Sequence, residues 1–175
     1  MADGRRCCRI LGLDPGSRFT GFGVVERKGS QWKPVAHGRW TLPAKAPLVE
    51  RLALLSAQAE SLIERHRPDS VALESLFHGI NPRSLIVLAQ ARGALVAVIG
   101  RAGIELYEYT PAEIKSAVTG SGRADKEQVS RMVRLILGLG EEGLSADAGD
   151  ALAVALCLAQ RSRLDRLVSG AQKWR

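Results

Sequence analysis

The fold is decided by residues 8–26, CRILGLDPGSRFTGFGVVE, in which two apolar runs flank a turn. The first run, Ile10–Leu13, has the dense aliphatic side chains of a buried strand. It ends at the turn cluster Asp14–Ser17, and Thr20–Glu26 follows as a second strand. A third strand is predicted over Trp32–Leu42, so the chain opens with three strands joined by tight turns, a pattern that indicates an antiparallel meander.

The middle of the chain alternates predicted helices and strands. An apolar stripe with steps of three or four residues indicates a helix that starts at Leu48 and ends at His66-Arg67-Pro68. Two short strands are predicted over Ser70–Glu74 and Ile104–Tyr109. Between them, Asn81-Pro82 is typical of a helix start, and that helix is predicted to run to about Ile99.

The last third of the chain is predicted to be helical. Capping boxes at Thr110–Glu113 and Asp125–Gln128 open two helices, and an Ala/Leu-rich buried helix follows from near Ser145 to about Gln160. The element order is therefore β-β-β-α-β-α-β-α-α-α, which predicts an α/β fold with a five-stranded mixed β-sheet flanked by helices. We expect one domain over residues 1–160 and a basic, mobile tail over residues 161–175.

The composition narrows the class of protein. A chain of 175 residues suits one domain with one core. Lys and Arg outnumber Asp and Glu by 25 to 18, giving a formal charge of +7, and a basic surface attracts polyanions such as nucleic acid. Cys7, Cys8 and Cys157 define no disulfide framework and make a zinc site unexpected. The sequence predicts neither a membrane span nor a signal peptide, so we expect a cytoplasmic protein.

Four carboxylates stand at the edges of predicted core elements. Asp14 ends the first strand and Glu74 ends the fourth, each directly after an apolar run. Asp147 and Asp150 are three residues apart at the start of the last helix, so they share one helix face. A carboxylate beside a core is costly unless its charge is compensated, and a bound cation is one compensation. If the two strands are neighbours, the four side chains can meet.

Four hard oxygen donors facing one spot favour Mg²⁺ or Mn²⁺. Two such ions can activate water and stabilise the leaving oxygen in phosphodiester cleavage. Each acid alone also has a structural explanation: Asp14 can start a turn, Asp147 or Asp150 can cap a helix, and Glu74 can pair with an arginine. The shared position of all four beside the core favours the joint interpretation.

Four segments, in order, resemble motifs of one nuclease family. DPGSRFTGFG at 14–23, ESLF at 74–77, AQARG at 89–93 and ADAGDALA at 146–153 resemble motifs of the RuvC family of Holliday-junction resolvases, in the RNase H-like superfamily. The resemblance runs from about residue 9 to residue 160. It implies an RNase H-like fold and a structure-selective endodeoxyribonuclease that resolves four-way DNA junctions by paired symmetric nicks in recombination and repair.

The resemblance also implies roles for particular residues. Asp14, Glu74, Asp147 and Asp150 would bind two Mg²⁺ ions, which Mn²⁺ could replace, with Asp14 between them. Phe77 matches an aromatic side chain that stacks on bases near the junction centre, and such stacking contributes about 1–3 kcal/mol per base. Basic positions that would contact DNA phosphates are Lys115 and Lys126 and, less directly, Arg18, Arg83 and Arg123. Core packing for Phe77 and a solvated surface for the basic residues are the alternatives.

The family resemblance implies partners as well as residues. It implies a homodimer, with the helix after Pro82 contributing to the interface, and a branch-migration motor of the RuvA–RuvB type as partner. Gly93 lowers helix propensity within that helix, so we expect a closely packed neighbour there. Burial of this helix within its own chain is the alternative, and the sequence does not separate the two.

Three other functions are compatible with parts of the sequence. Another RNase H-like nuclease, acting on RNA or RNA–DNA hybrids, would carry the same acids, but the 89–93 motif and Phe77 favour the resolvase. A nucleotide-binding protein of the actin or sugar-kinase type would need two lobes, for which 175 residues are too few. A catalytically inactive DNA-binding module is disfavoured because all four acids are present.

Overall fold

The computed structural model describes residues 8–16, 18–75, 81–140 and 143–171, with side-chain surroundings given up to residue 161. The elements in chain order are β1 (Arg9–Asp14), β2 (Phe19–Lys28), β3 (Gln31–Thr41), α1 (Leu48–His66), β4 (Ser70–Glu74), α2 (Pro82–Arg101), β5 (Glu105–Tyr109), α3 (Pro111–Thr119), α4 (Lys126–Leu137) and α5 (Ala146–Ala171). This order is the predicted one, so the α/β assignment is confirmed.

The five strands form one mixed sheet in the order β3-β2-β1-β4-β5. The hairpin strands pair antiparallel, β1 with β2 and β2 with β3, whereas β4 pairs parallel with both β1 and β5. The parallel pairs are connected through α1 and α2, as expected for strands that need a crossover. The predicted meander and the parallel second half are therefore both confirmed.

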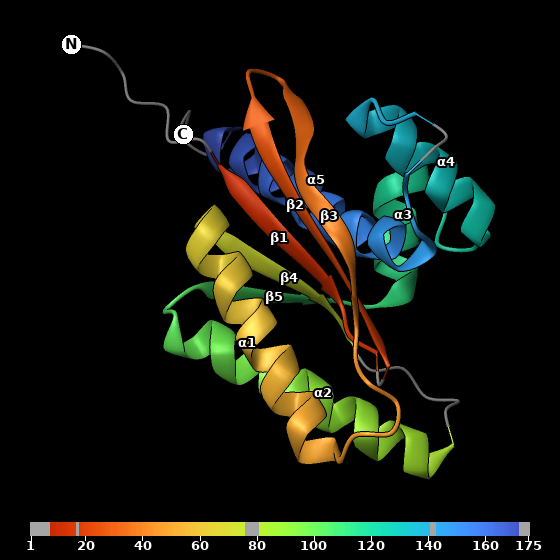
Figure 1. The fold of residues 1–175 in the computed structure, drawn as a ribbon. Coiled ribbons are helices and arrows are strands. Elements are labelled where there is room, and N and C mark those ends of the chain that lie inside the picture. The colour runs from red at the N-terminus through yellow and green to blue at the C-terminus, as the bar shows by residue number, and fades with distance from the viewer. Residues whose placement is uncertain (1–7, 17, 76–80, 141–142, 172–175) are drawn as a thin grey trace.

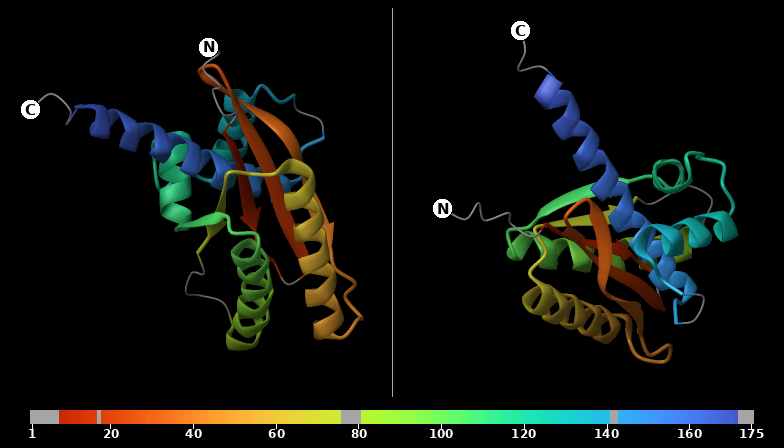
Figure 2. Two further views of the ribbon diagram at one scale, coloured as in Figure 1. Left: turned by 90° about the vertical axis from the view of Figure 1, so that its left-hand side faces the viewer. Right: turned by 90° about the horizontal axis from the view of Figure 1, so that it is seen from above.

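Helices cover both faces of the sheet (Figures 1 and 2). Helices α1 and α2 pack on one face, where large aliphatic side chains such as Leu11, Leu13 and Leu73 fill the core. Helix α5 crosses the other face, and α3 and α4 pack against it. Because strand side chains alternate between faces, each strand contributes to both cores.

Helix α5 approaches the sheet at glycines. A Cβ atom placed on Gly12 would lie 2.1 Å from the carbonyl oxygen of Ala151, and one placed on Gly21 would lie 2.0 Å from the carbonyl oxygen of Asp147. On Gly23 it would lie 2.7 Å from the Leu152 side chain. The helix therefore rests on bare backbone of β1 and β2, which brings its first turn close to the strand ends.

Helix α5 is longer than the sequence analysis predicted. We expected it to end near Gln160, but it continues to Ala171. The segment after Gln160 contains no proline, and its first glycine is Gly170, so nothing in the local sequence stops the helix earlier. The expected mobility of the tail remains a prediction.

Helix α2 is apolar but only partly buried by its own chain. Its inner side chains pack on α1 and β5, while Ile86 on the outer face is 61% exposed and a Cβ atom placed on Gly93 would meet no atom of another element within 4 Å. The predicted close packing partner of Gly93 is thus absent from the described part of this chain. By length and composition alone, α2 is the one described helix that could cross a membrane, a test that core helices also pass.

Candidate active site

The strand register brings the first two acids together at one edge of the sheet. Leu13 of β1 pairs with Leu73 of β4, so Asp14 and Glu74, the next residue of each strand, are neighbours. Gly12 and Ala72, two residues earlier, belong to the α5 side of the sheet. Alternation then places Asp14 and Glu74 on that same side.

The start of α5 supplies the other two acids, Asp147 in its first turn and Asp150 one turn later. The Ser145 hydroxyl accepts a hydrogen bond from the Ala148 amide (3.3 Å) and so caps the helix start. The carbonyl of Asp147 rests over Gly21, which pairs with Asp14. The structure therefore brings all four predicted carboxylates to one place. We call Asp14, Glu74, Asp147 and Asp150 the carboxylate cluster.

The carboxylate cluster is electrostatically strained. Burial, with added repulsion from Glu74, Asp150 and Asp147, raises the pKa of Asp14 to about 8. Burial and the charge of Asp150 also raise the pKa of Glu74, while a hydrogen bond from Asp14 works in the opposite direction. Without a cation, Asp14 is protonated near neutral pH, and its O–H can donate a hydrogen bond to the Glu74 carboxylate.

Two lysines face the cluster from α3 and α4. Lys115, Lys126, Glu74 and Asp150 line one cavity of about 110 Å³. The Lys126 ammonium lies 3.5 Å from the Asp150 carboxylate, although its side chain is 85% exposed. The positive charge of Lys126 lowers the pKa values of Asp14 and Glu74, and that of Lys115 lowers the pKa of Glu74. The two predicted basic positions are therefore at the site.

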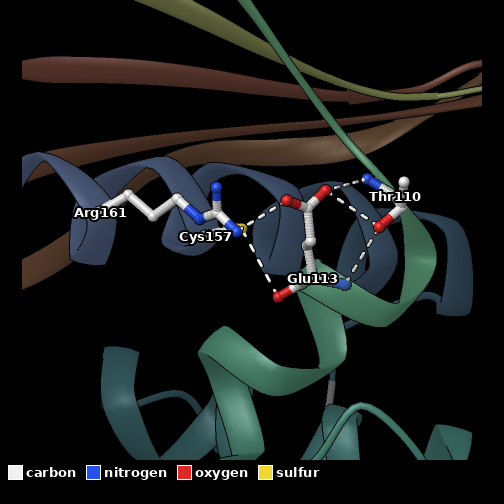
Figure 3. A network of polar contacts seen from close by, with 4 residues as sticks. All are labelled: Thr110, Glu113, Cys157 and Arg161. Carbon is white, nitrogen blue, oxygen red and sulfur yellow. Dashed lines mark hydrogen bonds and ion pairs between the residues drawn. The ribbon is translucent and has the colours of Figure 1, made fainter.

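Helix α3, which carries Lys115, is fixed by a polar network centred on Glu113 (Figure 3). The Glu113 carboxylate accepts hydrogen bonds from the Thr110 amide (2.9 Å) and from the Arg161 guanidinium of α5 (2.7 Å). The Cys157 thiol donates to the Glu113 carbonyl at 3.8 Å. The predicted capping box at Thr110 is thus confirmed, and it also joins α3 to α5.

The carboxylate cluster has the right chemistry for divalent cations, but its side chains are not arranged around one ion position. Its donors are hard oxygens, and the mutual repulsion that raises the pKa of Asp14 is what a cation would relieve. Among the residues that the structure describes, no three acidic, histidine or cysteine side chains converge as placed on one ion position. The Asp147 carboxylate is paired with Arg39, and that of Asp150 is paired with Lys126.

The remaining predicted DNA contacts lie elsewhere or outside the described residues. Arg18 is exposed, and its guanidinium lies 5.5 Å from the Phe19 ring centre. Arg83, in the first turn of α2, and Arg123, in the loop before α4, are exposed and do not line the lysine cavity. Phe77 falls within residues 76–80, outside the described residues, so its stacking role stays a prediction.

Arg39 of β3 is a site residue that the sequence did not indicate. Its guanidinium lies 3.3 Å from the Asp147 carboxylate and 4.4 Å from the centre of the Phe19 ring. Arg39 pairs with Gly21, which in turn pairs with Asp14. Only the register of β3 reveals this, because neither a motif nor the charge pattern distinguishes Arg39 from the other arginines.

The fold and the site together define a class of protein: an α/β protein of the RNase H-like type, with carboxylates at the ends of adjacent central strands and on the helix packed across them. The yeast mitochondrial Holliday junction resolvase has this fold, with a TM-score of 0.70 at 17% identity over 97% of this chain and 85% of that one.

Within this class, the chain belongs to the RuvC family. The family model for crossover junction endodeoxyribonuclease RuvC matches residues 10–158. The RuvC of Desulfitobacterium hafniense is 43% identical over 93% of this chain and 98% of its own, and that of Alkalilimnicola ehrlichii is 49% identical over 85% and 89%. Thermus thermophilus RuvC in complex with a Holliday junction substrate superposes with a TM-score of 0.85 at 33% identity, covering 90% of this chain and 96% of that one.

Proposed function

We propose that this chain cuts four-way DNA junctions by paired symmetric nicks, using the carboxylate cluster and two divalent cations. The observation that carries the proposal is the meeting of four carboxylates and two lysines at one sheet edge. Similar relatives are named crossover junction endodeoxyribonucleases, and the Thermus thermophilus relative is described with a Holliday junction substrate. Both facts favour a junction over RNA or a hybrid as the substrate.

The chain's own residues would orient the DNA and hold the cations. Asp14, Glu74, Asp147 and Asp150 would bind Mg²⁺, or Mn²⁺ in its place. When bound, the cations supply Lewis acidity and an activated water for phosphodiester hydrolysis. Lys115 and Lys126 would pair with phosphates beside the scissile bond once their carboxylate neighbours bind cations instead.

The protonation state of Asp14 sets the condition for activity. Its pKa of about 8 means that the proton must leave before the carboxylate can bind a cation fully. Cation binding and proton release are therefore coupled, and cleavage should increase as pH rises through neutrality. Lys126 assists because its charge lowers the pKa of Asp14.

A homodimer would present two such sites to the two strands that a symmetric cut requires. The outer face of α2 supports this arrangement: Ile86 is 61% exposed, and Ala89, Gly93 and Ala97 follow it on the exposed side of the helix. Small residues permit close approach of a second helix, which would fill the open space beside Gly93, where an added Cβ atom would meet nothing within 4 Å. We also propose a cytoplasmic location and a RuvA–RuvB type partner, both on family grounds alone.

The test is cleavage of a synthetic four-way junction, compared with matched linear duplex and RNA–DNA hybrid, in Mg²⁺, Mn²⁺ or EDTA. We expect symmetric nicks on the junction alone, none in EDTA, and a loss of at least about a hundredfold in Asp14→Asn. Preferential cutting of the hybrid would be consistent with the proposed metal site but would contradict the four-way junction as the substrate. Tight junction binding without any cleavage would favour the binding-module alternative.

A further inference from the structure

The register of the sheet places the Arg39 guanidinium on the side of the carboxylate cluster opposite the lysines. Gly21 of β2 lies opposite Asp14 of β1 on one side and opposite Arg39 of β3 on the other. Glu74 of β4 lies on the other side of Asp14. Because Gly21 has no side chain, the backbone of Asp147 lies directly over it, and the Asp147 carboxylate is within 3.3 Å of the Arg39 guanidinium. The cluster is therefore flanked by Lys126 on the α4 side and by Arg39 on the β3 side.

The Phe19 ring keeps Arg39 at the site without fixing it to Asp147. The Arg39 guanidinium lies 4.4 Å from the ring centre, and that of Arg18 lies 5.5 Å from it. A guanidinium over an aromatic ring is attracted to it and still has N–H groups free to point outward. The Arg39 side chain is 43% exposed, so its pairing with Asp147 is open to water and easily exchanged.

We propose that Arg39 is an exchangeable cation of the site. Without a divalent ion it neutralises Asp147. When a divalent ion binds Asp147, the guanidinium is released but stays on Phe19, where it pairs with a DNA backbone phosphate on the β3 side. This inference rests on the proposed function. It makes Arg39 both a competitor of the metal and a phosphate contact that forms only in the metal-bound site.

The first test needs no DNA. Mn²⁺ is titrated into the full-length protein by calorimetry, using wild type, Arg39→Gln and Arg39→Lys. Loss of a competing exposed ion pair should tighten Mn²⁺ binding by about two- to fivefold in Arg39→Gln. Arg39→Lys, which keeps the charge, should stay near wild type. The matched control is Arg101→Gln, which removes an exposed pair with Glu60 far from the cluster and should change nothing.

The second test measures the salt dependence of junction binding. In Ca²⁺, with the junction checked to be intact on a denaturing gel, Arg39→Gln should reduce the slope of log Kd against log salt by about 0.9, the value for one lost phosphate contact. In EDTA the slopes of wild type and Arg39→Gln should agree, because the charge of Arg39 is then neutralised by Asp147. A merely structural role for Arg39 would not produce this dependence on the cation.

Unchanged Mn²⁺ affinity in Arg39→Gln would overturn the proposal, and so would equal salt slopes in Ca²⁺ or unequal slopes in EDTA. Junction cleavage by the wild type is measured separately. If the wild type fails to cut the junction while Mn²⁺ binding still tightens in Arg39→Gln, the proposed function is at fault rather than the competition between Arg39 and the metal.

Discussion

The two faces of the sheet are packed in different ways. Toward α1 and α2, the strands present large aliphatic side chains, among them Leu11 and Leu73. Toward α5, the central strands present Gly12, Gly21 and Gly23, and helix backbone lies against strand backbone. The first face is an ordinary core that tolerates repacking, whereas the second fixes the position of the acids on α5 relative to those on the strands.

The largest expected effect comes from filling the glycine contact. In Gly21→Val, a Cβ atom 2.0 Å from the Asp147 carbonyl would force the start of α5 away from β2. Misplacement by about 1 Å can cost roughly a hundredfold in rate, so we expect at least that loss of cleavage, together with about 1–3 kcal/mol lower stability. Nicking kinetics and urea unfolding measure both. Gly140→Ala, where nothing lies within 4 Å, is the control and should retain both properties.

A core truncation on the other face should separate stability from activity. Leu55 of α1 is fully buried, so Leu55→Ala should lower the free energy of unfolding by about 2–5 kcal/mol. Because Leu55 lies on the face of the sheet opposite α5, cleavage per folded molecule well below the melting temperature should stay within about twofold of wild type. A loss of activity as large as that in Gly21→Val would contradict the distinction between the two faces.

The pH dependence of the melting temperature should show the effect of the raised pKa of Asp14, on the α5 side of the sheet. The pKa of Asp14 is raised to about 8 in the folded protein, so the folded state binds this proton more tightly than the unfolded state. The stabilisation is therefore complete at acid pH and is lost as pH rises toward 8. In EDTA, the melting temperature of wild type should fall relative to that of Asp14→Asn between pH 5 and pH 8.

Addition of Mg²⁺ provides the control for this pH effect. Mg²⁺ should raise the wild-type melting temperature more at pH 8 than at pH 5, because its ligands are then deprotonated. It should have less effect on Asp14→Asn at either pH. Parallel pH profiles of the two proteins in EDTA would show that Asp14 carries no such strain.

The smallest expected effect concerns the polar contacts of α3 (Figure 3). Glu113→Gln keeps the side-chain oxygen that accepts from the Thr110 amide but removes the charge that pairs with Arg161. Both partners are more than a third exposed, so unfolding should become easier by no more than about 1 kcal/mol. Urea unfolding measures this change, and Glu60→Gln, in another exposed pair, is the matched control. A larger loss confined to Glu113→Gln would show that this α3–α5 contact contributes more to stability than an ordinary exposed ion pair.

Most elements and all four acids could be predicted from local sequence. Periodicity and capping residues indicated each helix and strand in order, because these signals act within a few residues. Asp14 and Glu74 were recognisable because each directly follows an apolar run, and Asp147 and Asp150 because they share one face at the start of an otherwise apolar helix. The end of α5 was predicted wrongly, since Ala171 lies beyond the apolar stretch that indicated the helix.

What the sequence by itself determined, then, is the element order, the acids and their family. Only the tertiary structure decided that Arg39 joins the site and that α5 rests on Gly12 and Gly21. The pairing of β3 with β2 depends on the register of strands that meet only after folding, and no local pattern encodes that register. The raised pKa of Asp14 has the same origin, because burial and neighbouring charges come from segments far apart in the chain.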